Sequence, residues 1–215
     1  MFVANRMTKN PMVVTPDTTL DEAAALMKKG KFRRLPVVED GQLVGFFSDK
    51  DLMRVAPSPA TTLSRYEERS LLAKLKVRDI MLKEVISVPE EATIEEAALI
   101  MCENKIGGLP VISSVGAVVG VITETDIFKT FVDVMGLRAG TTRLTIETDD
   151  KVGVVYELSS VFADHGLSID SLVTCRQPNG KYEIVIRGDI PDPGTIKQEI
   201  EAKGYRVIHT VRIGG

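Results

Sequence analysis

At 215 residues the chain is long for a single domain, so we expect two compact units. With 44% hydrophobic and 27% charged residues it has an ordinary globular composition, and its net charge of -3 gives no basic surface for nucleic acid. No apolar run approaches the ~20 residues of a transmembrane helix, and residues 1–10 lack the apolar core of a signal peptide. Cys102 and Cys175 are isolated, which argues against a zinc site or a disulfide framework. We therefore expect a cytoplasmic protein.

Most of the first 133 residues are duplicated. Met7-Thr8 matches Met81-Leu82, and three longer segments then recur in the same order: 19–24 as 93–98, 35–38 as 109–112, and 45–51 as 120–126. Two copies of so long a repeat do not make a solenoid. The pattern favours a duplicated unit that packs as a pair.

Each copy predicts a strand, a helix, two strands and a helix. An extended segment (12–14 or 85–88) leads to a helix that begins at Thr19 or Thr93, each with a capping box completed by Glu22 or Glu96. We expect these helices to stop near the glycines at positions 30 and 107. Strands follow at 35–38 and 43–47, and at 109–112 and 117–122; short helices start at positions 49 and 124. A connection at 55–75 is expected to be partly helical.

The last third has another pattern. Residues 143–148 predict a strand, 149–153 a turn, and the following apolar run a helix that stops at Gly166. Strands at 168–176 and 182–187 flank Pro178-Asn179-Gly180, which is a strong hairpin signal. A break at 191–194 precedes a second helix, ended by Gly204, and a strand at 205–213. The order βαββαβ is the ferredoxin-like arrangement.

These motifs carry family resemblances. Met-Thr, Leu-Pro-Val-Val and Gly-x-x-(Ser/Thr)-x-x-Asp, in two copies, resemble a pair of CBS domains, and the last third more weakly resembles an ACT domain. The whole architecture is similar to the acetoin-utilisation AcuB-type proteins. The predicted fold class is α+β, comprising tandem CBS repeats and a ferredoxin-like ACT domain. The expected boundaries are repeat 1 at 1–54, a linker at 55–75, repeat 2 at 76–133, a linker at 134–140 and the ACT domain at 141–215.

The resemblance implies an adenosine-nucleotide site, and the residues suit one. Ser48 and Thr123 would place a hydroxyl and free backbone N–H groups near a phosphate, and Asp51 and Asp126 could accept both hydrogen bonds of a ribose diol. The apolar positions expected to sandwich an adenine are Val14, Val38, Val88 and Ile112. Related CBS sequences often place a basic phosphate contact at the position of Arg34, and Arg33 would assist it.

Helix capping is the competing interpretation of Ser48-x-x-Asp51 and Thr123-x-x-Asp126. We favour ribose binding, with capping as a second role, because the pattern recurs in both copies and because Asp reaches back to an N-cap less well than Glu. The copies also differ: Arg34 corresponds to Gly108, and Ser87, a further candidate contact, corresponds to Val13. Two equal clefts, or one working and one degenerate cleft, both stay open, as does which repeat supplies which cleft.

In the ACT-like part, the resemblance implies that an amino acid could bind at the turn formed by Asp149, Asp150 and Gly153, against Ser168 and Ile169. A tight turn in a domain that only dimerises is the favoured alternative. His165 and His209, the only histidines, have no partner at catalytic or metal-binding spacing, so we expect structural roles.

The expected function is therefore that of a regulatory sensor, not an enzyme. It would bind AMP, ADP, ATP or S-adenosylmethionine, and would use no cofactor, metal, membrane or nucleic acid. The AcuB-type resemblance implies control of acetoin or carbon metabolism, and we expect a homodimer. The alternatives are a dimeric scaffold without ligand, an enzyme, against which the lack of any P-loop or nucleophile motif counts, and, last, a DNA-binding regulator.

Overall fold

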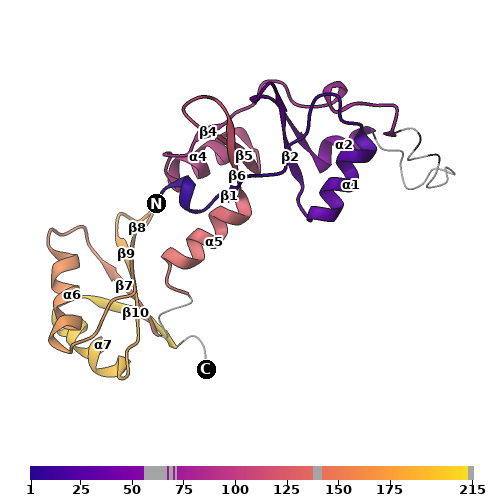
Figure 1. Cartoon of the computed structure of the whole chain (residues 1–215). Coiled ribbons are helices and arrows are strands. Elements are labelled where there is room, and N and C mark those ends of the chain that lie inside the picture. The colour runs from indigo at the N-terminus through magenta and orange to yellow at the C-terminus, as the bar shows by residue number, and fades with distance from the viewer. Residues whose placement is uncertain (56–66, 68–69, 71, 138–141, 213–215) are drawn as a thin grey trace. The chain divides into compact units, whose positions relative to one another are not determined.

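The computed structural model describes residues 1–55, 67, 70, 72–137 and 142–212. They form two compact units, Met1–Ile127 and Phe128–Gly215. The first unit holds both repeats up to Ile127, and the second holds the remaining residues of the second repeat and the ACT-like part (Figure 1). The expected helical connection at 55–75 falls mostly outside the described residues, as do residues 138–140 of the expected second linker.

Both copies form the predicted helix, strand, strand and helix, but the expected leading strand forms only in the second, since residues 12–14 contribute a single isolated bridge, Val14 to Val37. The first contains α1 (Leu20–Gly30), β2 (Arg34–Glu39), β3 (Gln42–Ser48) and α2 (Asp49–Val55). The second contains β4 (Val88–Pro89), α4 (Ile94–Asn104), β5 (Gly108–Ile112), β6 (Val118–Thr123) and α5 (Glu124–Val134). The two hairpins even share a register shift at the equivalent place, after Val37 in one and after Val111 in the other.

The predicted capping boxes are present in both repeats. Thr19 Oγ1 accepts a hydrogen bond from the Glu22 N–H at 3.3 Å, and Glu22 Oε2 accepts one from the Thr19 N–H at 3.0 Å. Thr93 and Glu96 make the same pair at 3.2 Å and 2.7 Å. The hydrogen bonds from Thr93 hold the pKa of Glu96 below its usual value. Sequence therefore located the start of both helices correctly.

Both helices end near the expected glycines, at Gly30 and at Asn104, but glycine does not supply the left-handed residue that ends them. The left-handed residues that end the helices are Lys31 and Lys105, both at φ 54°. Gly30 is the last residue of α1, and a Cβ there would lie 1.9 Å from the ring of Phe32. This glycine makes room for the folded-back ring, while Gly107 lies beyond the end of α4.

The segment ahead of each repeat packs on the other copy. β1 (Thr8–Lys9) precedes the first repeat but pairs antiparallel with β6, and Val3 of η1 (Val3–Asn5) belongs to the core of the second repeat. Conversely, η2 (Val77–Asp79) precedes the second repeat, but Val77 belongs to the core of the first. Val3 and Val77 are both 0% exposed. The repeats thus exchange their leading segments.

This exchange is reciprocal down to single side chains. A Cβ at Gly120 would lie 2.2 Å from Met7 Sδ, and a Cβ at Gly45 would lie 2.4 Å from Met81 Sδ. Because Met7 is equivalent to Met81, and Gly45 to Gly120, the two contacts are the same contact made in both directions. Reciprocal contacts of this kind indicate an approximate twofold axis between the repeats.

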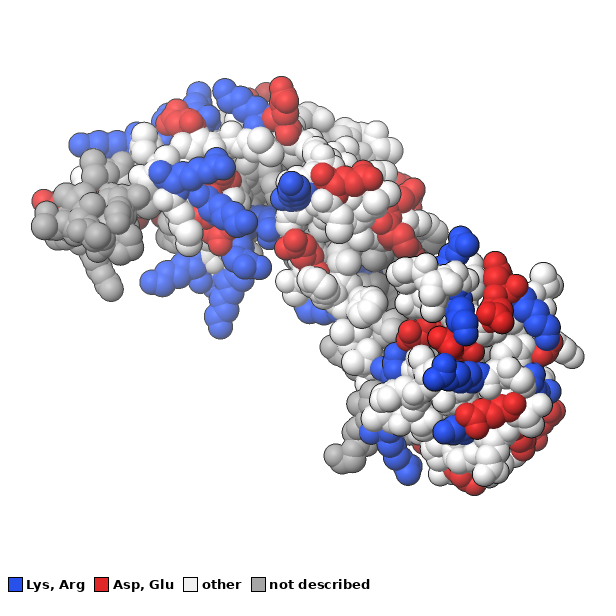
Figure 2. All heavy atoms as spheres, turned by 180° about the vertical axis from the view of Figure 1, so that it is seen from behind, with Lys and Arg blue, Asp and Glu red and all other residues white. Residues whose placement is uncertain are grey.

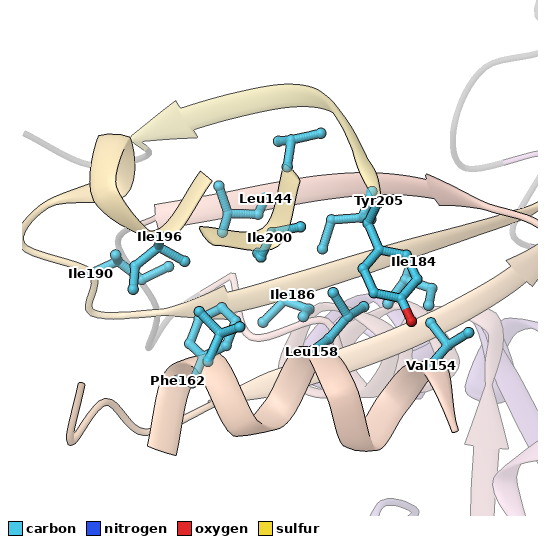
Figure 3. Packing of buried hydrophobic residues seen from close by; sticks show 13 residues of the cluster. Leu144, Val154, Leu158, Phe162, Ile184, Ile186, Ile190, Ile196, Ile200 and Tyr205 are labelled. Carbon is cyan, nitrogen blue, oxygen red and sulfur yellow. The ribbon is translucent and has the colours of Figure 1, made fainter. Parts of the chain in front are cut away.

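The second unit has the predicted order: β7 (Thr142–Thr148), α6 (Val154–Asp164), β8 (Ser171–Arg176), β9 (Tyr182–Gly188), α7 (Pro193–Ala202) and β10 (Arg206–Arg212). Its antiparallel sheet has the strand order β10-β7-β9-β8, which is that of a ferredoxin-like fold. Both helices lie against one face of the sheet (Figure 1). Leu158 and Phe162 of α6 pack toward Ile184 and Ile186 of β9 (Figure 3).

Two details of this unit differ from, or refine, the sequence expectation. β8 begins at Ser171 instead of residue 168, and Asp170, just before it, donates its N–H to the Arg187 carbonyl at 2.9 Å. The hairpin turn forms as predicted, with Gly180 at φ 82°. Within the described residues, no helix is long and apolar enough to cross a membrane.

Candidate functional site

In the described part of the first unit, each of the two hydroxyl–aspartate patterns lies at a cavity. The Asp51 cavity, of about 300 Å³, is lined by Arg34, Phe46, Ser48, Asp49, Lys50, Asp51, Arg54, Leu82, Glu84, Val85, Ile86, Lys105, Ile106, Gly107 and Gly108. The Asp126 cavity, of about 240 Å³, is lined by Thr8, Pro11, Met12, Lys31, Phe32, Arg33, Arg34, Val121, Thr123, Thr125 and Asp126.

Both aspartates are fixed by the hydroxyl residue three positions earlier, where a strand ends and a helix begins. Asp51 Oδ2 accepts hydrogen bonds from the Ser48 N–H at 3.0 Å and from its Oγ–H at 2.5 Å, and Asp51 Oδ1 lies 3.6 Å from Arg54 Nη1. Asp126 Oδ2 accepts the corresponding bonds from Thr123 at 3.0 Å and 2.7 Å.

In both repeats Asp therefore does reach back to the N-cap, contrary to the expectation from sequence. β3 and β6 deliver Ser48 and Thr123 so close to the following helical turn that the short side chain spans the gap. Capping is an established role of both aspartates. It also holds each carboxylate in one orientation at a cavity wall, as a ribose contact would require. The ribose role itself stays a prediction.

Each cavity is built from both repeats. The Asp51 cavity joins α2 of the first repeat to Val85 and Ile86, which lie just ahead of β4. The Asp126 cavity joins α5 to Pro11 and Met12, which lie ahead of α1. The exchange of leading segments explains this, because the residues that face an aspartate come from the other copy.

Among the described residues, Arg34 alone lines both cavities. It is half-buried, and burial is the main reason why its pKa lies below the usual arginine value; the neighbouring Arg33 adds to this, while Glu124 and Asp49 oppose it. Arg33 is exposed and lines only the Asp126 cavity. The structure thus brings both predicted arginines to the predicted aspartates.

The apolar residues expected to sandwich an adenine are placed differently. Val14 and Val88 are 5% and 2% exposed and belong to the cores of the repeats. Neither of them lines either cavity. The same is true of the remaining candidates, which are Val38, Ser87 and Ile112. Val14 lies between the backbone of β2 and the core, since its N–H donates to the Pro36 carbonyl and its carbonyl accepts from Val38.

Met12 and Ile86 supply the apolar walls instead, together with Phe32 and Val85. Met12 and Ile86 occupy equivalent positions in the two copies and are 51% and 40% exposed. Their alignment in the repeat was a signal that sequence reasoning passed over. Large apolar side chains exposed at a cavity are typical of ligand sites.

Sequence reasoning also missed most of the cations. Lys31 lines the Asp126 cavity, and Lys50, Arg54 and Lys105 line the Asp51 cavity. Lys and Arg side chains gather on the first unit (Figure 2). The run Lys28-Lys29-Gly30-Lys31-Phe32-Arg33-Arg34 was the available signal, although its charge does not reveal which members face a cavity.

A third cavity, the turn cavity, lies in the second unit and has a volume of about 270 Å³. Its lining is Thr148, Asp149, Asp150, Lys151, Gly153, Val154, Val155, Tyr156, Thr174, Tyr182 and Ile184. Three of the five predicted ACT ligand residues, Asp149, Asp150 and Gly153, thus come together. Gly153 has φ 92°, so it also makes the tight turn that was the alternative role.

Ser168 and Ile169 do not line the turn cavity, which corrects that part of the prediction. The turn follows Thr148, which pairs with Tyr182 at one end of β9, whereas Ser168 lies beside Gly188 at the other end. The separation is roughly 20 Å at about 3.3 Å per residue. The reason is that α6 runs back along the sheet, so the chain leaves it at the far end.

An ion-pair network fixes the turn. Lys151 Nζ lies 3.0 Å from Glu157 Oε1, and the Tyr205 hydroxyl donates to Glu157 Oε2 at 2.6 Å. The Tyr205 hydroxyl, followed by Lys151, holds the pKa of Glu157 below its usual value. Burial, and then Glu157, raises the pKa of Tyr205. The turn is thereby tied to α6 and to the residue before β10.

Neither histidine lines the Asp51 cavity, the Asp126 cavity or the turn cavity, although His209 lines another pocket, formed by β10 and the start of α7. His165 Nε2 lies 2.8 Å from Glu199 Oε1 and so joins the end of α6 to α7, while His209 is exposed on β10. In the described part of the chain, no three His, Cys, Asp or Glu side chains are grouped in a way that could hold a metal ion.

Comparison with known proteins identifies the class. The chain matches the CBS domain family over residues 3–58 and 77–133, and the ACT domain family over residues 142–204. Because the CBS matches span more than half of the chain, this protein belongs to the CBS-domain family and carries an ACT domain after its CBS pair. The two family resemblances drawn from the motifs are confirmed.

Particular relatives match over the CBS pair. A CBS domain-containing protein of Dictyostelium discoideum is 31% identical over 136 residues, which is 63% of this chain and 94% of that protein. The CBS pair of protein MJ0100, solved with 5'-methylthioadenosine and S-adenosyl-L-methionine, is 26% identical with a TM-score of 0.51, over 61% of this chain and 95% of that one.

Two further solved structures are similar to this chain. CBSX2 of Arabidopsis thaliana in complex with AMP is 30% identical with a TM-score of 0.51, over 61% of this chain and 96% of that one. A Vibrio cholerae protein that carries the name AcuB, for acetoin utilization, is 29% identical with a TM-score of 0.52, over 64% and 95%. The resemblance to AcuB-type proteins is confirmed by this match.

Proposed function

We propose that this chain is a regulatory sensor whose CBS pair binds an adenosine nucleotide (AMP, ADP or ATP) or S-adenosylmethionine. The observation that carries the proposal is the duplicated site: each cavity holds an aspartate fixed at its wall by a hydroxyl residue, next to exposed apolar side chains and arginine. The solved relatives with AMP and with S-adenosyl-L-methionine support the same class of ligand.

The cavity walls suit the three parts of a nucleotide. Asp51 and Asp126 would accept from the ribose hydroxyls, because carboxylates are good acceptors for a diol. Ile86 in one cavity and Met12 in the other would pack on the adenine. Arg34 would donate to a phosphate, since a guanidinium matches phosphate oxygens with two parallel hydrogen bonds.

A sensor needs its ligand to favour one conformation over another. We propose that the ligand biases the packing of the two repeats and, through it, the ACT domain or a target protein in the cytoplasm. The similarity to the AcuB protein leads us to propose acetoin or carbon-metabolism control as the setting. The turn cavity is proposed as a second site, for a small metabolite, with Asp149 and Asp150 as its polar contacts.

The alternative is a homodimeric scaffold without ligand. The exposed apolar residues of α5 favour it, since Phe128 and Phe131 are 68% and 57% exposed and a second copy would cover them. A sensor can also be a dimer, so finding a dimer does not distinguish the sensor from the scaffold. Only a test of ligand binding does. An enzyme is the weaker proposal, because the sequence contains no nucleophile or P-loop motif.

The test is a thermal-shift panel of AMP, ADP, ATP, S-adenosylmethionine and amino acids on the wild type and two variants, Asp51→Asn and Asp126→Asn. Asn keeps one capping oxygen but removes the charge. A ligand at ~100 times its Kd stabilises the fold by about 2.7 kcal/mol, which is an easily measured shift. We expect an adenosine compound to stabilise the wild type, and one or both variants to lose that response.

The matched control is Glu96→Gln, which makes the same change in a capping box that lines neither cavity. It should keep the full ligand response. If no compound shifts the melting of ligand-stripped protein, the scaffold replaces the sensor. A response that both aspartate variants retain would move the ligand out of the two cavities.

A further inference from the structure

The two cavities share Arg34 because of where it lies relative to the twofold axis between the repeats. Arg33-Arg34 of the first copy corresponds to Gly107-Gly108 of the second. A Cβ at Gly108 would lie 3.0 Å from Arg34 Cδ, and a Cβ at Gly107 would lie 2.3 Å from Arg34 Nη2. Arg34 thus lies against Gly108, its counterpart in the second copy. A residue that touches its own symmetry counterpart lies at the twofold axis.

This contact explains why the second copy has no equivalent arginine. The space that a side chain at position 108 would need is filled by the stem of Arg34. One arginine therefore has to serve two sites that are otherwise built alike. Because neither glycine has a side chain, the guanidinium lies along the backbone of residues 107 and 108, between the cavities.

The charges around Arg34 are also arranged in pairs. Asp49 and Glu124 are equivalent first residues of α2 and α5, and each attracts Arg34 electrostatically. Glu124 Oε2 would lie 2.7 Å from the same Cβ at Gly107 that meets Arg34 Nη2. No ion pair ties Arg34 to any residue within the described ranges. The guanidinium is held near both carboxylates but committed to neither.

We propose that Arg34 is a single phosphate contact shared by the two cavities, so that a phosphate-bearing ligand in one weakens the binding of a second in the other. The inference rests on the proposed function and adds its regulation: negative coupling between the two sites. A guanidinium that turns toward one phosphate withdraws its hydrogen bonds and its charge from the other cavity.

The Asp51 cavity should be the one whose affinity for the ligand falls. Among the described residues that line it, apart from Arg34, three cations face three carboxylates: Lys50, Arg54 and Lys105 against Asp49, Asp51 and Glu84. The described lining of the Asp126 cavity has Lys31 and Arg33 besides Arg34, with Asp126 as its one carboxylate. An anion therefore binds first in the Asp126 cavity, draws Arg34 toward it, and leaves the Asp51 cavity without net positive charge.

Calorimetric titration of the full chain, stripped of ligand, with AMP tests this. We expect two binding steps per chain, the second about tenfold weaker, within the range of ordinary coupling. Asp126→Asn should abolish the first step and leave Asp51-cavity binding uncoupled. Adenosine, which lacks the phosphate, should show no such difference between the steps.

Two variants isolate Arg34. Arg34→Met keeps the stem and removes the charge, and we expect the difference between its two AMP steps to narrow to what the unequal charges of the two linings leave. Gly107→Ala keeps the charge, but its methyl group displaces the guanidinium from its position beside Gly107, so it should also reduce the coupling. This second variant keeps the test valid if Arg34→Met folds poorly. Lys28→Met is the matched control, because it removes an exposed cation that lines neither cavity; its coupling should equal that of the wild type.

The outcomes separate this inference from the proposed function. Two equal and independent AMP steps in the wild type, a tighter second step, or coupling that persists in Arg34→Met and Gly107→Ala, would each overturn shared use of Arg34 and leave the sensor intact. Binding of S-adenosylmethionine without any binding of AMP would do the same. If no adenosine compound binds, both proposals fail together.

Discussion

At the scale of single residues, the lysines that end α1 and α4 hold a conformation that suits glycine better. Lys31 and Lys105 are both at φ 54°. An L side chain in this left-handed region costs about 1 kcal/mol, and glycine avoids most of that cost. The same strained residue in both repeats means that the turn into β2 and β5 dictates the backbone there.

Replacing Lys105 with glycine should therefore stabilise the first unit, by roughly 0.5–1 kcal/mol in urea unfolding of the full chain. The same change at Lys28, inside α1, should destabilise it by about 1 kcal/mol, because glycine weakens a helix interior. Equal losses from both changes would show that Lys105 relieves its strain through contacts that glycine cannot make. Since Lys105 lines the Asp51 cavity, the variant should also bind a phosphate ligand there more weakly.

Much of the candidate site was predictable at this scale, and the exceptions have physical causes. Ser48 with Asp51, and Thr123 with Asp126, could be found because a strand end, a cap and a carboxylate follow one another in the chain. The shared position of Arg34 could not, because it depends on a contact between residues 34 and 108 across a local axis. Sequence showed only that the second copy has glycine there, not that Arg34 fills the space.

At the scale of elements, repetition in the sequence predicted the helices and strands of both copies but not how the copies assemble. Two matching segments indicate that residues 1–10 and 76–83 do the same task. They do not indicate for which repeat, because packing within one copy or across to the other buries the same side chains. That ambiguity explains why the walls of each cavity could not be assigned from sequence.

The exchange of leading segments can be tested at Val3. This side chain is 0% exposed in the core of the second repeat, so Val3→Ala should cost about 2 kcal/mol and loosen α4 and β6 more than α1. Hydrogen exchange measured segment by segment shows which repeat responds. Val13→Ala is the control, since Val13 is 40% exposed. Loosening of α1 in place of α4 would contradict the exchange.

In the second unit, the link between α6 and the start of β10 depends on ionised Glu157. Tyr205→Phe removes the hydroxyl that donates to it and should lower the melting temperature at neutral pH. Because the pKa of Glu157 is lowered, its contribution is present above the usual carboxylate range and is lost as the pH falls through it. Because the pKa of Tyr205 is raised, the hydroxyl contributes below its usual range and ceases to do so as the pH rises above it.

The difference between Tyr205→Phe and the wild type should accordingly shrink at acidic pH, in calorimetric scans run from neutral to acid. Tyr156→Phe is the matched control, because Tyr156 is 77% exposed. A difference that stays constant over the whole pH range would mean that the ring packing of Tyr205 matters and its hydrogen bond does not.

For the whole molecule, each unit has its own buried hydrophobic residues and its own cavities, in agreement with the length and the two kinds of pattern in the sequence. The repeated motifs identified the CBS pair more surely than the single copy of each motif identified the ACT domain. Two of five ACT site residues were misplaced because βαββαβ order says nothing about which loops share an end of the sheet, until the direction of α6 is known.

The exposed apolar stripe on α5 is suited to contact a second copy of the chain. Phe128, Phe131 and Val134 recur every third residue on α5 and are 68%, 57% and 48% exposed. A stripe of this kind is buried on both sides at once when two identical helices meet, because a twofold contact uses the same patch twice. Phe131→Glu places a charge in that contact and should convert a dimer into a monomer in light scattering at micromolar concentration. Lys129→Glu, an exposed change on the same helix, should leave the dimer intact. If the wild type is itself a monomer, the stripe does not pair with a second copy, and the scaffold alternative loses its main support while the nucleotide sensor does not.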